Sequence, residues 1–120
     1  MNKTIKEFCK EAHETAISKG FWEMIPAYII FKKDGKIIQK YKLRERNDGE
    51  LIALMHCELS EALEALRHTD KSKNNVGEEL ADCCIRIFDY CEARDIDLEK
   101  EIIKKMKYNK TRPIKHGKKF

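Results

Sequence analysis

Residues 55–84 read MHCELSEALEALRHTDKSKNNVGEELADCC. The pattern predicts two helices joined by a short polar connector, and each helix carries two acids three residues apart: Glu58 and Glu61, then Glu79 and Asp82. Residues three apart share one face of a helix, so each pair directs two carboxylates the same way. A connector this short makes the two helices antiparallel neighbours, and the four acids then converge on one spot.

These four acids need a stabilising partner. Glu58, Glu61 and Glu79 have no basic residue four positions further on, whereas Asp82 has Arg86. Buried carboxylates are costly unless they are paired or bind a metal, and oxygen ligands suit hard cations such as Mg²⁺, with Mn²⁺ as the alternative. The competing interpretation is a solvated charged surface, because 38% of the residues are charged and acids three apart also arise by chance.

The order ExxE, connector, ExxD resembles the signature of the all-α nucleoside triphosphate pyrophosphohydrolases, the MazG-like superfamily that includes dimeric dUTPases and dCTP pyrophosphatases. The similarity extends to GFW at 20–22, ELIALMHCELSEALEALR at 50–67, EELADCCIRIFDY at 78–90 and KKMKYNKTRPIKHGKKF at 104–120. It leaves mainly residues 24–46 unmatched. The resemblance implies one mainly α-helical domain over residues 1–120, a four-helix bundle assembled across a subunit interface as a homodimer or as a tetramer of two dimers.

The resemblance also implies an activity. This is Mg²⁺-dependent hydrolysis of nucleoside triphosphates, preferentially deoxynucleoside triphosphates, between the α and β phosphates to give a nucleoside monophosphate and pyrophosphate. Glu58, Glu61, Glu79 and Asp82 would hold the metal. Glu61 and Glu58 are the catalytic candidates, with Glu61 preferred as the general base for an attacking water. Other nucleotide-derived pyrophosphates, such as modified nucleotides, are alternative substrates.

The last part of the chain supplies candidates for phosphate binding. By the same resemblance, Lys105, Asn109 and Arg112 match a KM..N..R pattern that faces the triphosphate. Asp97 predicts the N-cap of the helix that carries them, and this helix should stop before Pro113. Residues 110–120 form a basic tail, which in other proteins is either solvated or binds nucleic acid.

Three residues are candidates for the base pocket. His13 and Trp22 have the spacing of a base-binding pair in the dCTP pyrophosphatase branch, but a lone histidine or tryptophan is as often structural. Arg86 stands where that branch has an aromatic residue, so a preference for cytosine is not implied. Besides the base, Arg86 could pair with Asp82 or contact phosphate.

The remaining elements follow from periodicity and turn signals. Apolar residues at helical spacing predict helices over residues 3–19, from Asn47 or Asp48 to about His68, and from Val76 to about Arg94. Between the first two helices, AYIIFKK and KIIQKYK flank Asp34-Gly35, a pair typical of a type I′ turn. We therefore expect an inserted β-hairpin over about residues 27–42.

An isolated two-stranded hairpin is only marginally stable in water, so we expect this one to pack on the bundle or against a partner subunit. As a decoration it would have no direct role in function. The alternatives are that it covers the substrate pocket or extends a subunit interface.

Composition sets further limits. The formal net charge of +4 is too small to indicate a general nucleic-acid binder. Five cysteines without a CxxC pair argue against a disulfide framework. No secretory signal opens the chain and no apolar run reaches the length of about 18 residues that a membrane helix needs, so we expect a soluble cytoplasmic protein without a membrane partner. The main alternative function is a non-catalytic helical interaction module whose basic tail binds nucleic acid or a partner protein.

Overall fold

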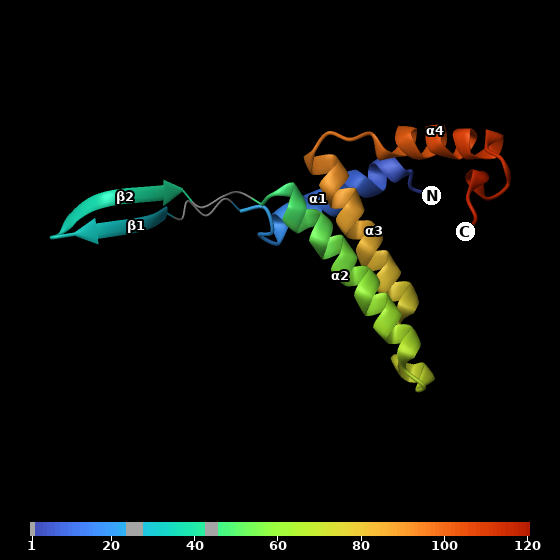
Figure 1. Ribbon diagram of the computed structural model, residues 1–120, viewed down its shortest axis with the longest axis horizontal. Coiled ribbons are helices and arrows are strands. Elements are labelled where there is room, and N and C mark those ends of the chain that lie inside the picture. Colours follow the sequence, from blue (N-terminus) through green and yellow to red (C-terminus); the bar gives the residue numbers. More distant parts are fainter. Residues whose placement is uncertain (1, 24–27, 43–45) are drawn as a thin grey trace.

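The computed structural model describes residues 2–23, 28–42 and 46–120. Its helices and strands are α1 (Ile5–Ser18), β1 (Tyr28–Lys33), β2 (Lys36–Lys42), α2 (Asp48–Arg67), α3 (Val76–Ala93) and α4 (Leu98–Thr111), with short 3₁₀ turns at Lys71–Lys73 and Ile114–Gly117 (Figure 1). The predicted mainly helical architecture with one inserted hairpin is confirmed. None of the helices in the described ranges is long and apolar enough to cross a membrane.

Local capping explains where the helices begin and end. Thr4 and Glu7 form a reciprocal capping box at the start of α1. The side chains of Asn47 and Asp97 accept hydrogen bonds from backbone N–H groups in the first turns of α2 and α4, as the sequence predicts. Gly20, with φ of 84°, ends the first helical segment in the left-handed conformation that glycine adopts at little cost.

Helices α2 and α3 are antiparallel neighbours, and α1 packs across α3 (Figure 1). The buried residues of these helices are small or medium in size: Cys9, Leu51, Ala62, Ala65, Cys83 and Cys91. Three larger apolar residues of α2, Leu59, Leu63 and Leu66, are about half exposed, at 48–61%. Short side chains take up little space between two helices, so these buried residues permit close packing of α2 and α3.

The cysteines act as small apolar side chains in this core. Burial raises the pKa of the Cys9, Cys83 and Cys91 thiols, which keeps them protonated. All five cysteines of the chain are free thiols, in agreement with the absence of a predicted disulfide framework.

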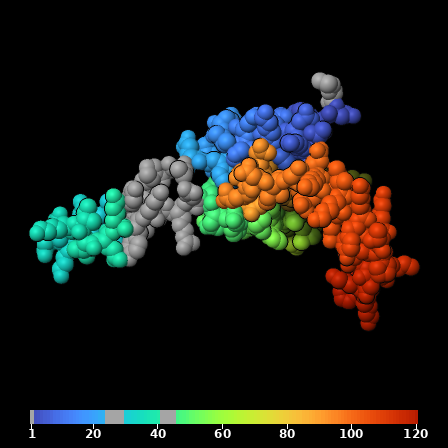
Figure 2. Space-filling view, turned by 90° about the horizontal axis from the view of Figure 1, so that it is seen from above, coloured from blue at the N-terminus to red at the C-terminus, as the bar shows by residue number. Residues whose placement is uncertain are grey.

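Helix α4 departs from a closed bundle within one chain. Its first turn is held by the Ile5 N–H, which donates to Glu99 Oε1 at 3.2 Å, and the rest of the helix runs away from α2 and α3 (Figures 1 and 2). Ile103, Met106 and Tyr108 are 52–59% exposed. The radius of gyration is 20.4 Å, against about 14 Å for a compact domain of this length. Three helices therefore pack together, and the fourth leaves its apolar face open.

The hairpin forms as predicted, with β1 and β2 antiparallel and a register shift between Phe31 and Lys32. Asp34 and Gly35 both have positive φ, 50° and 73°, as a type I′ turn requires. Residue 27, the expected first residue, lies outside the described residues. The hairpin does not pack on the helices of its own chain: it lies beyond them at one end of the molecule (Figures 1 and 2).

Candidate functional site

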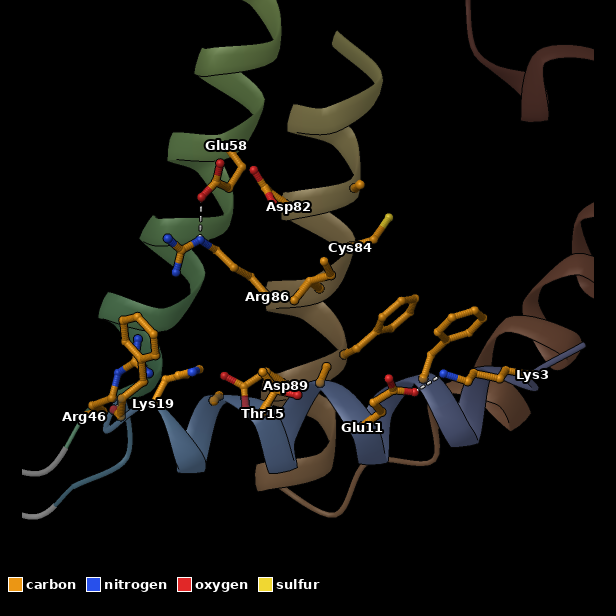
Figure 3. A pocket seen from close by; sticks show the side chains of 17 residues that line it. Lys3, Glu11, Thr15, Lys19, Arg46, Glu58, Asp82, Cys84, Arg86 and Asp89 are labelled. Atoms are coloured by element: carbon orange, nitrogen blue, oxygen red, sulfur yellow. Dashed lines mark hydrogen bonds and ion pairs between the residues drawn. The ribbon is translucent and has the colours of Figure 1, made fainter. Parts of the chain in front are cut away.

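The acids of the central stretch meet between α2 and α3. Glu58, Glu61 and Glu79 each offer one carboxylate oxygen, and these oxygens lie within 4.8 Å of one another. Asp82 is outside this group of three, but its side chain points from α3 toward Glu58 on α2 (Figure 3). The predicted convergence is thus present for three of the four acids, with the fourth beside it.

The three clustered carboxylates have unequal electrostatic surroundings. Glu58 is only 8% exposed, and the hydrogen bond from Arg86 lowers its pKa. The pKa of Glu61 is raised, first by Glu58 and then by Glu79, because its deprotonated form faces two other carboxylates. Glu79 accepts a hydrogen bond from Asn75 Nδ2 at 2.8 Å. Glu61 is therefore the acid whose negative charge is least compensated.

Arg86 reaches from α3 to α2, and its Nε donates to Glu58 Oε1 at 2.7 Å (Figure 3). The sequence left a pairing with Asp82, four residues earlier on the same helix, as one possibility. The structure pairs Arg86 with the acid of the neighbouring helix instead. This ion pair crosses the interface between the two helices and places a cation at the edge of the acidic cluster.

A cavity of about 750 Å³ opens beside the acids, between α1 and α3. Glu58, Asp82 and Arg86 line its polar part. Phe8 and Phe88, whose rings stack with centroids 5.8 Å apart, line its apolar part. This volume is in the range of small-molecule sites, and the wall combines apolar side chains with charged side chains of both signs.

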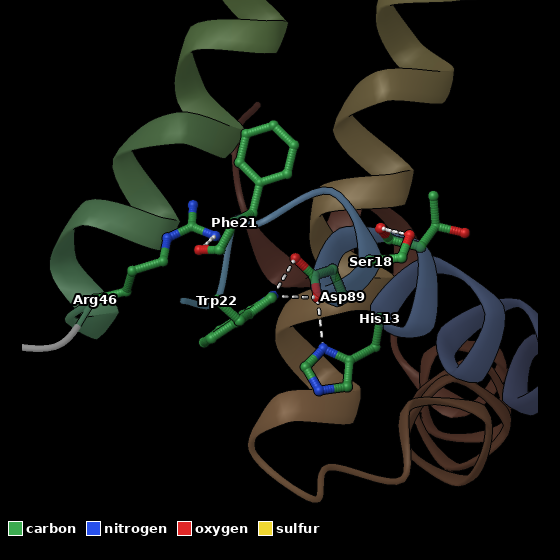
Figure 4. A network of polar contacts seen from close by, with 7 residues as sticks. His13, Ser18, Phe21, Trp22, Arg46 and Asp89 are labelled. Carbon is green, nitrogen blue, oxygen red and sulfur yellow. Dashed lines mark hydrogen bonds and ion pairs between the residues drawn. The ribbon is translucent and has the colours of Figure 1, made fainter. Parts of the chain in front are cut away.

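A second polar network is centred on Asp89 of α3 (Figure 4). Its carboxylate lies 2.7 Å from His13 Nδ1, and Trp22 Nε1 donates to both carboxylate oxygens at 2.9 and 3.1 Å. The His13 and Trp22 rings meet edge to face, with centroids 5.3 Å apart. The structure thus brings the two base-pocket candidates together, but directs their polar groups at Asp89.

Asp89 is the residue that sequence reasoning missed. It lines the cavity, whereas His13 and Trp22 do not. A signal was present: Asp82, Arg86 and Asp89 stand at positions i, i+4 and i+7, so they share one face of α3. This charged stripe is the side of α3 that faces the cavity.

Two arginines, Arg46 and Arg94, lie near the Trp22 ring. The guanidinium groups of Arg46 and Arg94 lie 5.1 and 5.8 Å from the centre of the Trp22 ring. Arg46 also donates to the Phe21 carbonyl, and Arg94 pairs with Asp48 at 2.7 Å. These contacts fix the segment after α1 against the start of α2, and Arg46 itself lines the cavity.

The phosphate-binding candidates lie elsewhere in the chain. Lys105, Asn109 and Arg112 belong to α4 and its C-cap, and none of them lines the cavity beside the acids. Lys105 and Arg112 instead flank the ring of Tyr108, at 4.9 and 5.5 Å from its centre. Within one chain the structure does not bring these groups to the acidic cluster.

Comparisons of this chain with models of protein families, with curated proteins and with solved structures find no match.

Proposed function

We propose that this protein is a divalent-cation-dependent nucleoside triphosphate pyrophosphohydrolase, as its resemblance to the MazG-like superfamily implies. The observation that carries the proposal is the convergence of Glu58, Glu61 and Glu79 from two antiparallel helices. Two further observations support it: the adjacent cavity has the size of a small-molecule site, and Asp82 lies at its acidic edge.

The donor set fits Mg²⁺ or Mn²⁺. All of the candidate ligands are carboxylate oxygens, the ligand type that hard cations prefer. The raised pKa of Glu61 supports this fit, because it reflects mutual repulsion that a divalent cation would relieve. Glu58, Glu61, Glu79 and Asp82 would hold the ion. When bound, the ion would neutralise phosphate oxygens and activate the attacking water.

The side chains then have separate tasks in the reaction. Glu61 accepts the proton of the water that attacks the α-phosphorus, since it is the exposed acid of the cluster and water can reach it. The bond between the α-phosphorus and the bridging oxygen breaks, and pyrophosphate leaves with that oxygen. Glu58 is buried between α2 and α3, which limits its movement during this step. The products are a nucleoside monophosphate and pyrophosphate.

The base would occupy the apolar part of the cavity, between α1 and α3. His13 and Trp22 contribute by holding Asp89, which faces the cavity and can accept hydrogen bonds from a base. Phe8 and Phe88 offer apolar surface for the rest of the nucleoside. In this proposal the base specificity rests on Asp89 more than on the histidine or the tryptophan.

The phosphate-binding candidates would be contributed by a second copy of the chain. Two features support a homodimer, or a tetramer made of two dimers: the open apolar face of α4 and the extended shape of the single chain. Pairing would cover Ile103 and Met106 and bring the α4 of one chain to the acids of the other. Lys105, Asn109 and Arg112 would then face the β and γ phosphates.

The direct test is product analysis with the common nucleoside and deoxynucleoside triphosphates and Mg²⁺ or Mn²⁺. We expect pyrophosphate and monophosphate from the wild type, and a loss of rate of roughly 10²- to 10⁴-fold in Glu61→Ala. Glu64→Ala is the matched control, because Glu64 lies on the same helix but forms an exposed ion pair with Arg67. Equal rates in Glu61→Ala and the wild type would refute the proposal.

The second candidate function is a helical interaction module without catalysis. The exposed apolar face of α4 and the basic residues that follow it favour this alternative. It predicts no metal-dependent turnover. It also predicts binding that survives Glu61→Ala and is lost when the lysines of the tail are replaced, which fluorescence anisotropy with a labelled nucleic acid would measure.

A further inference from the structure

Arg86 lies beside the acidic cluster and has no contact with the substrate in the proposed reaction. Among the described residues it is the only basic side chain within ion-pair distance of the acidic cluster, where it pairs with Glu58 at 2.7 Å. That single bond uses Nε, and its two terminal nitrogens donate no hydrogen bond to any described residue. The side chain is 36% exposed and lines the cavity. Arg86 is thus attached to the cluster through a single hydrogen bond, and its terminal donors remain available to a ligand in the cavity.

The ion pair competes with a divalent cation for the same carboxylate. A metal ion bound among Glu58, Glu61 and Glu79 would lie close to a guanidinium that donates to one of its ligands, and two cations at such a distance repel. The guanidinium can move into the cavity instead, because the Arg86 side chain is long and lines the cavity. Its planar fork binds phosphate oxygens in pairs, so a phosphate in the cavity would accept the released donors.

We propose that Arg86 is an exchangeable counter-cation. It holds Glu58 while the site is free of metal; when a divalent cation takes that carboxylate, it turns into the cavity and binds a phosphate group of the substrate. This inference rests on the proposed function. It assigns Arg86 to the phosphate rather than to the base, and it makes metal binding a condition for the phosphate contact.

Metal binding tests the first half of the proposal without any turnover. Titration calorimetry with Mn²⁺ alone would compare the wild type with Arg86→Gln, and with Arg67→Gln, which removes an exposed cation from α2. We expect Arg86→Gln to bind Mn²⁺ about tenfold more tightly, because a competing charge is gone, and Arg67→Gln to match the wild type. An affinity of Arg86→Gln that is unchanged or weaker would overturn the inference.

Pyrophosphate binding tests the second half. In the presence of saturating Mn²⁺ we expect Arg86→Gln to bind inorganic pyrophosphate about tenfold more weakly than the wild type, and Arg67→Gln to be unaffected. Arg86→Lys keeps the charge but loses the fork, so it should leave Mn²⁺ affinity close to that of the wild type and still weaken pyrophosphate binding. Unchanged pyrophosphate binding in both Arg86 variants would refute the phosphate contact.

The proposed function and the proposed role of Arg86 fail in different ways. A wild type that binds no Mn²⁺ defeats the proposed function, and this inference with it. A wild type that binds Mn²⁺ with the same affinity as Arg86→Gln defeats only the inference. Circular dichroism of each variant checks that the helices are retained, and Arg86→Lys carries the pyrophosphate test if Arg86→Gln fails to fold.

Discussion

Asp89 and Glu61 are both acids at the interfaces between α3 and its neighbours, and their surroundings are opposite. Asp89 faces two ring nitrogens, His13 Nδ1 and Trp22 Nε1, so its charge has partners within the chain. Glu61 faces two carboxylates, which raise its pKa. Asp89 is an acid that the fold satisfies, and Glu61 is one that the fold leaves beside like charges. Asp89 therefore holds structure while it lines the cavity, and Glu61 is the candidate ligand of the cation that we propose.

The largest expected effect on stability comes from removing Asp89, which accepts hydrogen bonds from His13 and Trp22. Asp89→Ala should lower the free energy of unfolding by about 2–3 kcal/mol, because two half-buried donors lose a charged acceptor. Urea unfolding followed by circular dichroism measures this loss. Glu14→Ala, an exposed acid of α1, should change the same quantity by less than about 0.5 kcal/mol. An effect of Asp89→Ala as small as that of the control would show that the network adds nothing to the fold.

The next largest effect concerns the three clustered carboxylates and the cation that we propose for them. A divalent cation that binds only the folded chain should stabilise it, by about 2.7 kcal/mol at a concentration a hundred times its dissociation constant. Thermal unfolding with Mn²⁺ and with EDTA measures this gain. We expect Asp89→Asn to keep the gain and Glu79→Gln to lose most of it, since Glu79 belongs to the cluster of three. If the gain were lost in Asp89→Asn and kept in Glu79→Gln, the cation would bind at Asp89 and not at the cluster of three acids.

The smallest effect is a dependence of stability on pH in the absence of metal. The pKa of Glu61 in the folded chain lies above its ordinary 4.5. The contribution of Glu61 to the free energy of unfolding is therefore greatest below pH 4.5 and is lost as Glu61 loses its proton at higher pH. Glu58 acts in the opposite direction: its lowered pKa gives stability that is lost as the pH falls below 4.5.

Urea unfolding in EDTA from about pH 3 to pH 8 measures both slopes. Glu61→Gln should flatten the upper part of the curve, because it removes the titrating group, and should keep most of the lower part, because Arg86 is the main cause of the lowered pKa of Glu58. A wild-type curve that rises steadily through the upper range would contradict the predicted repulsion among the three carboxylates.

The sequence predicts those parts of the molecule that depend on nearby residues. Helix caps at Asn47 and Asp97 and the turn at Asp34-Gly35 are local signals, and each is found where it was expected. The meeting of Glu58, Glu61 and Glu79 was also predictable, because the connector of α2 and α3 is too short for another arrangement.

Contacts between distant residues could not be predicted in this way. Asp89 and His13 are 76 residues apart, so no periodic pattern links them. Arg86 had a suitable partner on its own helix, Asp82, and nothing in the pattern favours Glu58 across the interface. The direction of α4 could not be predicted for a related reason: an apolar stripe shows that a helix needs a neighbour, but not which chain provides it.

The small residues between α2 and α3 have a consequence for ion selectivity. Ala62 and Ala65 stand one turn after Glu58 and Glu61, and the pair is 95% or more buried, at 5% and 3% exposure. Side chains this short permit a small distance between two helices, so residue size at these positions would affect the spacing of the carboxylates on α2 and α3. Mg²⁺ demands oxygens at about 2.0–2.1 Å, whereas Ca²⁺ accepts about 2.3–2.6 Å. For the cation that we propose, the size of the side chain at residue 62 would therefore select the ionic radius, and a larger side chain than that of Ala62 would shift the preference from magnesium toward calcium.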